Sequence, residues 1–138
     1  MFSRKSGKGR SSKTPTAKAV EVFNSVHIVA ERVGPVLCVR VVDEHITERE
    51  SGILYDETEA LIDERCTAIV LDLASVGMLA SAGIGAVVKL HKRMGERKGM
   101  LAVCGLSTEL TELFKLTRMD RLLMVKPDRD AAIAALSS

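Results

Sequence analysis

Three short apolar runs limit the folds open to this chain more than any other feature. They are Val36–Val42, Ala68–Leu73 and Met100–Cys104, and the first is rich in β-branched residues. Runs of about four to eight apolar residues fit strands that are covered on both faces, as in a parallel sheet. A segment with helical periodicity follows each run, so the sequence predicts strands and helices in alternation.

Capping residues mark where the expected helices begin. Thr47 and Glu50 match a capping box, in which each side chain bonds a free backbone N–H of the other residue, and this helix is expected to end near Arg65. The other helices are expected over residues 83–94, after the capping residue Ser107, and over residues 129–136 behind Asp128.

Two further strands are expected at the ends of the pattern. Val20–Ala30 alternates apolar and polar residues and is expected to form one strand, and Leu122–Val125 a short last strand. The chain of 138 residues is long enough for one domain. The fold class expected is therefore a single α/β domain, with a mixed, mostly parallel sheet of about five strands and about four α-helices.

The core of this domain must be aliphatic. Hydrophobic residues make up 46% of the chain, but aromatic residues only 3%. Because stacking platforms need aromatic faces, this composition argues against base stacking as a binding mode.

The positive charge is concentrated at the amino terminus. Six of the 20 basic residues and no acidic residue lie in the first 20 positions, so the other 14 basic residues face 18 acidic ones, a balance of −4. A segment rich in Ser, Gly and Lys cannot bury enough apolar surface to fold alone. We expect residues 1–18 to form a basic, disordered arm and residues 19–138 the domain. The arm could instead touch nucleic acid or an anionic membrane.

The cysteines and histidines show no metal-binding spacing. Cys38, Cys66 and Cys104 are far apart and lie in or beside apolar segments, and the three histidines, His27, His45 and His91, are isolated. No metal site, no cofactor and no catalytic group is expected. Buried free thiols suit a reducing compartment, and no secretory signal or membrane-spanning run is present, so a cytoplasmic protein is expected.

The stretch Leu71–Leu90 carries the most functional information. A buried strand ends at Leu73, a loop of small residues follows, and Ala80-Ser81-Ala82-Gly83 leads into a helix. Binding sites in open α/β sheets lie beyond the carboxyl ends of strands. Ser81 is expected at or next to the N-cap position, where it has two interpretations. It could simply cap the helix, or it could accept a phosphate, which the free N–H groups and the positive helix end would favour.

The chain from about Val36 to the carboxyl terminus resembles the STAS family, which includes bacterial anti-sigma-factor antagonists. The motifs that carry the resemblance are Leu71-Asp72-Leu73, Ser81-Ala82-Gly83-Ile84-Gly85, Val103-Cys104-Gly105-Leu106-Ser107 and Leu116-Thr117-Arg118-Met119-Asp120. Two positions depart from the family pattern, because Ala80 and Thr47 stand where acidic residues are usual.

The resemblance implies a protein-binding regulator, not an enzyme. Its partner would be an anti-sigma factor with serine kinase activity, and Ser81 would be the phosphorylated residue. The docking surface would comprise Ala80, Ser81, Ala82, Gly83, Ile84 and Thr47. No direct nucleic acid binding and no membrane insertion are expected, and the oligomeric state, the sigma factor and the regulated response stay open.

Other functions remain to be distinguished from this one. The domain could be a constitutively binding STAS scaffold or a transporter-associated subunit. It could also be a nucleotide-binding domain that uses the helix start as an anion site, although Gly83-Ile84-Gly85 is too short for a dinucleotide fingerprint. The basic run from Lys89 to Lys98 is either a solvated face or a surface that steers an acidic partner.

Overall fold

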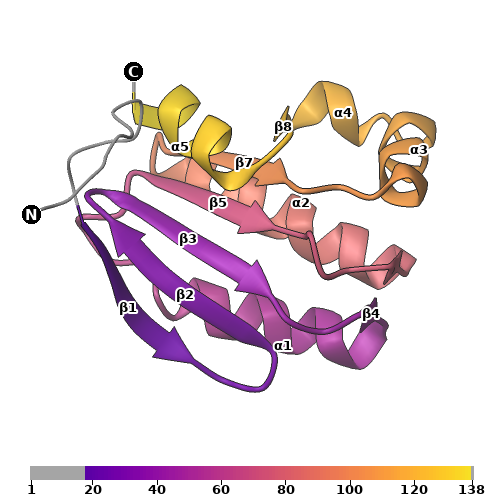
Figure 1. Ribbon diagram of the computed structural model, residues 1–138, viewed down its shortest axis with the longest axis horizontal. Helices are drawn as coiled ribbons and strands as arrows, with labels where there is room; N and C mark the ends of the chain where they lie inside the picture. The colour runs from indigo at the N-terminus through magenta and orange to yellow at the C-terminus, as the bar shows by residue number, and fades with distance from the viewer. Residues whose placement is uncertain (1–17, 138) are drawn as a thin grey trace, which may run out of the picture.

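The computed structural model describes residues 18–137, which form a main sheet with helices on both faces (Figure 1) and a separate two-stranded sheet. The expected arm lies outside the described residues, apart from Lys18. Along the chain the elements are β1 (Ala19–Asn24), β2 (Ile28–Val33), β3 (Val36–Val41), β4 (His45–Ile46), α1 (Glu48–Glu59), β5 (Ala68–Asp72), β6 (Met78–Leu79), α2 (Ser81–Glu96), β7 (Met100–Cys104), α3 (Thr108–Leu116), α4 (Met119–Leu122), β8 (Met124–Lys126) and α5 (Arg129–Ser137).

The main sheet has the strand order β1-β2-β3-β5-β7-β8. The two hairpin-connected pairs, β1/β2 and β2/β3, are antiparallel, and the three pairs that follow are parallel. The parallel pairs arise because a helix intervenes between each strand and the next. The predicted α/β class and the mixed, mostly parallel sheet are confirmed, with a few more strands and helices than expected.

Side chains on the central strands alternate between two apolar clusters. Leu37 and Val39 of β3 face the larger cluster, to which α1, α2 and α3 contribute. Val36 and Cys38 face the opposite side, where Ala132 and Ile133 of α5 complete a smaller cluster. Figure 1 shows α1 and α2 behind the sheet and α5 in front of it. Both faces are covered, which explains why the runs in the sequence are continuously apolar.

The expectation of a single strand over Val20–Ala30 was wrong. The chain turns at Ser25, and β1 and β2 form a hairpin around it. The Ser25 hydroxyl accepts hydrogen bonds from the N–H groups of His27 and Ile28, at 3.0 and 3.2 Å. The backbone N–H of Ser25 donates to the carbonyl of Ile28. Serine favours turns because its side chain can replace a backbone partner in this way.

The first helix ends at Glu59 and not near Arg65, as was expected. Arg97, at the end of α2, donates hydrogen bonds to the carbonyl oxygens of Asp63 and Cys66 at 2.5 and 3.1 Å, and Arg32 of β2 donates to the carbonyl of Leu61 at 3.2 Å. These carbonyl groups are therefore bonded by arginine side chains instead of by a continuing helix. Arg97 is also not part of the solvated basic face that the run 89–98 suggested.

The capping predictions for α1, α3 and α5 are confirmed. Thr47 and Glu50 form the capping box of α1, Ser107 accepts a hydrogen bond from the N–H of Leu110, and Asp128 accepts one from the N–H of Ala131 at 2.8 Å. Three elements were not predicted from the sequence, namely β4, β6 and α4. Each has two to four residues, which is too short for a period to be recognised.

The three thiols are free and buried, as expected. Burial raises the pKa of Cys38 to about 11 and that of Cys104 to about 12. Because the thiolate is the reactive form, we predict that an aromatic disulfide reagent at pH 8 modifies none of the three thiols of the native protein within minutes. In denaturant all three should react, as counted by absorbance. Rapid modification of a thiol in the native protein would contradict the packing of the sheet.

Candidate functional site

A two-stranded sheet brings together the two segments that the resemblance singled out. β4 and β6 pair in parallel, with His45 opposite Met78 and Ile46 opposite Leu79. The N–H of Ala80 donates to the carbonyl of Ile46 at 2.9 Å, which extends this pairing by one step. Thr47 follows β4 and Ser81 follows Ala80, so the starts of α1 and α2 lie side by side beyond the carboxyl ends of the parallel strands (Figure 1).

Ser81 is the first residue of α2, and its side chain is exposed. The N-cap of this helix is Ala80, whose backbone is extended and whose methyl group cannot cap. The interpretation of Ser81 as the helix cap is therefore wrong. Within the described residues its hydroxyl makes no hydrogen bond, so it is free to meet another molecule.

The backbone at the start of α2 favours a negative charge. The first N–H groups of any helix lack intrahelical partners and form its positive end. No acidic residue occupies the first turn of α2. An anion on Ser81 would therefore be stabilised by its own helix, although two acidic residues, Glu48 and Glu50, lie in the first turn of the neighbouring α1.

The other predicted docking residues divide into exposed and buried positions. Thr47 is exposed, and Ala80, Ala82 and Ile84 are half-buried. Gly83 is buried beneath them: a Cβ added there would lie 2.4 Å from Cδ1 of Leu79 and 3.1 Å from Cγ2 of Ile46. Gly83 therefore allows α2 to pack against β4 and β6, and it shapes the surface without being part of it.

Thr47 is tied to the first turn of α1. Its N–H donates to Oε1 of Glu50 at 3.0 Å, and its hydroxyl donates to the same carboxylate. The hydrogen bond from the Thr47 hydroxyl is the main reason why the pKa of Glu50 lies below its usual range. The acidic side chain missing at position 47 is thus replaced by a hydroxyl that contacts the carboxylate of a neighbour.

A groove between α1 and α2 begins beside Ser81 and was not predicted. It has a volume of about 230 Å³ and is lined by Glu48, Ser51, Gly52, Tyr55, Asp56, Ala82, Gly85, Ala86 and Lys89. The Nζ atom of Lys89 lies 4.1 Å from the centre of the Tyr55 ring. Gly52, in the middle of an otherwise regular helix pattern, is the one signal in the sequence that could have marked this groove.

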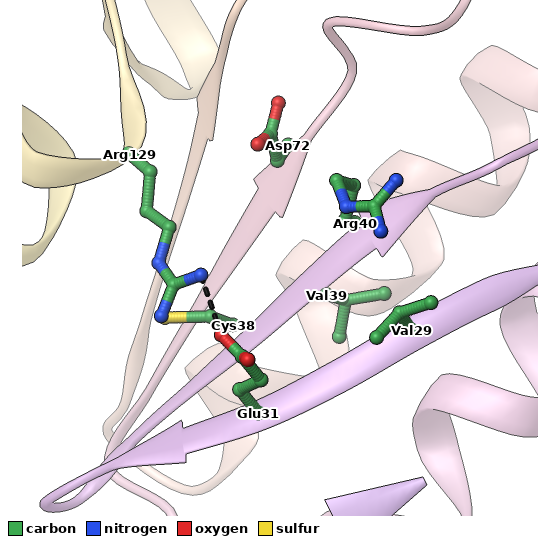
Figure 2. A pocket seen from close by; sticks show the side chains of 7 residues that line it. All are labelled: Val29, Glu31, Cys38, Val39, Arg40, Asp72 and Arg129. Atoms are coloured by element: carbon green, nitrogen blue, oxygen red, sulfur yellow. Dashed lines mark ion pairs between the residues drawn. The ribbon is translucent and has the colours of Figure 1, made fainter. Parts of the chain in front are cut away.

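A second hollow lies on the opposite face of the sheet (Figure 2). In it Arg129 of α5 pairs with Glu31 of β2 at 2.6 Å, above Cys38. Asp72 and Arg40 stand at the other end. Its volume is only about 100 Å³, and two of the four charged side chains that line it, Arg129 and Glu31, pair with each other. We interpret the Arg129–Glu31 pair as a contact that holds α5 on the sheet.

Neither a metal site nor a membrane span is found in the part of the chain that the structure describes. Over residues 18–137 no three His, Cys, Asp or Glu side chains converge in a way that could hold a metal ion. His27 pairs with Asp43 at 2.7 Å, without a third ligand. In the same range, no helix has the length and apolarity needed to cross a bilayer.

The packing of Gly83 yields a direct test of the site's architecture. Because Leu79 is buried, it cannot easily move away from an added methyl group. We predict that Gly83→Ala lowers the free energy of unfolding by about 1–3 kcal/mol, measured by urea denaturation. Gly95→Ala, at an open helical position, is the control and should not be destabilised. Equal stability of Gly83→Ala and wild type would contradict the close packing.

The capping box gives a prediction about pH. Since the pKa of Glu50 is lower in the folded than in the unfolded protein, its ionised form stabilises the fold above the unfolded pKa of about 4.3, and this stabilisation is lost as the pH falls through the folded value. We predict that Glu50→Gln destabilises the protein at pH 7 and that the difference from wild type narrows below about pH 4. Thr47→Val should weaken the same pH dependence. If Glu50→Gln and wild type differed in stability by the same amount at pH 7 and below about pH 4, the capping box could not be the source of this pH dependence.

Comparisons with known proteins identify the family of this chain. The family model for the STAS domain matches residues 27–132. A candidate anti-sigma factor antagonist of Bordetella bronchiseptica, BtrV, is 29% identical over 85 residues, which are 62% of this chain and 73% of BtrV.

Two solved structures share the fold. An anti-sigma factor antagonist from Mycobacterium paratuberculosis has a TM-score of 0.72 at 22% identity, over 80% of this chain and 93% of that chain. The Bacillus cell fate determinant SpoIIAA in its phosphorylated form has a TM-score of 0.59 at 14% identity, over 76% of this chain and 96% of that chain. With the family match covering most of the sequence, the chain belongs to the STAS domain family.

Proposed function

We propose that this protein is an anti-sigma factor antagonist, a binding switch that engages an anti-sigma factor with serine kinase activity. The observation that carries the proposal is Ser81, whose hydroxyl is exposed and unbonded at the start of α2. The names of its relatives support the same role, since BtrV and the mycobacterial protein are described as anti-sigma factor antagonists.

The docking surface would be built around this serine. Exposed Thr47 and half-buried Ala80, Ala82 and Ile84 surround it, and Gly83 fixes their positions from below. The surface is small and mostly uncharged, so a partner can pack closely against it. The nearest basic side chain that follows on α2 is Lys89, two turns further along.

Phosphorylation would turn this surface off. A phosphate on Ser81 adds a charge of about −1.5 to −2, and the helix start stabilises it in the free protein. A partner that covered it would have to desolvate the dianion, which is costly unless a cation pairs with it. The free domain therefore tolerates the phosphate better than the complex does, and the partner is released.

The domain would not itself be a catalyst. The partner would bind ATP and transfer its terminal phosphoryl group to the Ser81 oxygen, which loses its proton as ADP leaves. Such a partner acts inside the cell, so we propose a cytoplasmic location. A constitutive scaffold would use the same surface without the phosphate, and this distinction is what the experiment must decide.

Phosphorylation of Ser81 is tested with purified anti-sigma factors of the source organism and ATP. We predict that intact-mass analysis shows one added phosphate on wild type and none on Ser81→Ala. Ser75→Ala, which alters an exposed serine in the preceding loop, is the matched control and should be phosphorylated normally. An unmodified wild type, or a phosphate on Ser81→Ala, would contradict the proposed switch.

The effect of charge on binding is measured separately. Ser81→Asp should weaken the affinity for the same anti-sigma factor by at least about tenfold, which corresponds to about 1.4 kcal/mol, as measured by calorimetry. Equal affinities of wild type and Ser81→Asp would favour a constitutive scaffold.

A further inference from the structure

The groove between α1 and α2 is lined by one stripe of each helix. Glu48, Gly52 and Asp56 lie four residues apart on α1, and Ala82, Ala86 and Gly85 lie within one turn of each other on α2. Residues at this spacing share a helix face. The stripe on α2 begins at Ala82, next to Ser81, so the groove continues the proposed docking surface.

Two glycines in this groove have no structural reason within the domain. Apart from the adjoining residues and backbone of its own helix, a Cβ added at Gly52 or at Gly85 would meet no atom of the described chain within 4 Å. Neither glycine has a positive φ angle, since that conformation occurs only at Gly34 and Gly105 among the described glycines. Glycine inside a helix is less stable than alanine. Glycine at both positions therefore lowers the stability of the helices, and the domain gains no closer packing in return.

The edge of the groove on α1 carries unpaired negative charge. Within the described residues Glu48 and Asp56 make no ion pair, whereas Lys89 on the opposite edge is held against the ring of Tyr55. The two carboxylates lie eight positions apart on one helix, or ~12 Å along its axis. A ligand with two cations at this separation would match them.

We propose that this groove receives a helix of the anti-sigma factor, which packs on Gly52 and Gly85 and presents Lys or Arg side chains to Glu48 and Asp56. A close approach to a helix backbone requires positions without side chains, which explains both glycines. The two carboxylates on this edge outnumber the single cation Lys89 in the lining, which disfavours nucleic acid as the occupant because its phosphates would be repelled. This inference rests on the proposed function and specifies which part of the partner binds where.

The first test separates the stability of the domain from its binding. Gly52→Ala and Gly85→Ala should each raise Tm by a few degrees, and each should weaken binding to the anti-sigma factor that binds wild type by at least about tenfold. Gly95→Ala is the matched control, because it is also an open helical glycine of α2 but lies outside the groove. It should raise Tm similarly and bind as wild type does.

The second test addresses the charges. Glu48→Gln/Asp56→Asn should slow association with the partner at low salt by about tenfold and make the rate less dependent on salt. Glu96→Gln, which alters an exposed acidic residue at the other end of α2, should leave the association rate and its salt dependence unchanged. The groove variants should still be phosphorylated on Ser81, because the serine itself is unchanged. Phosphorylation should require a high partner concentration, because these variants bind the partner more weakly.

The outcomes distinguish the two proposals. If no anti-sigma factor of the source organism binds wild type, the proposed function fails and this inference fails with it. If wild type binds and both glycine variants bind equally well, only the groove proposal is overturned. A fall in Tm of Gly52→Ala or Gly85→Ala would also overturn it, because the glycines would then serve the fold. A wild-type homodimer that these substitutions disrupt would overturn it as well, because a second copy would then occupy the groove. Tighter partner binding after removal of residues 1–17 would also overturn it, because the basic arm would then occupy the groove.

Discussion

The pairing of β4 with β6 is the contact on which the candidate site depends. It involves only two residues of each strand and one further hydrogen bond, from Ala80 to Ile46. The pairing joins the loop that follows β3 to the loop that follows β5, and these two strands are neighbours in the main sheet. Gly83 makes the contact possible, because any larger side chain would collide with Leu79 and Ile46. The starts of α1 and α2 are thereby held side by side.

This arrangement gives the two helix starts different roles. At the start of α1, the side chains of Thr47 and Glu50 satisfy each other. At the start of α2, Ala80 offers no side-chain bond, and the hydroxyl of Ser81 stays free. A helix end without a capping side chain is less stable than a capped one. The start of α2 therefore lacks a capping side chain and carries an exposed hydroxyl, whereas the start of α1 is capped within its own first turn.

Much of the fold could be predicted because its signals are local. The continuous apolar runs predicted the buried strands β3, β5 and β7 almost to the residue, and capping side chains predicted the starts of α1, α3 and α5. Errors occurred where a local pattern competes with a distant contact. Asn24 and Ser25 were compatible with a strand or a turn, and α1 ends at Glu59, before a loop whose carbonyl groups are bonded by Arg97, 34 positions after Asp63.

The α/β class, the order of the elements and the position of Ser81 at the beginning of a helix could all be predicted from the sequence, because periodicity, capping and the motif around Ser81 are properties of neighbouring residues. Which residues share the surface around Ser81 became clear from the three-dimensional packing. It buried Gly83, exposed the serine hydroxyl, brought Thr47 from another loop and aligned Gly52 with Gly85 across two helices. These relations depend on the packing of segments about 30 residues apart, and no local pattern encodes that packing.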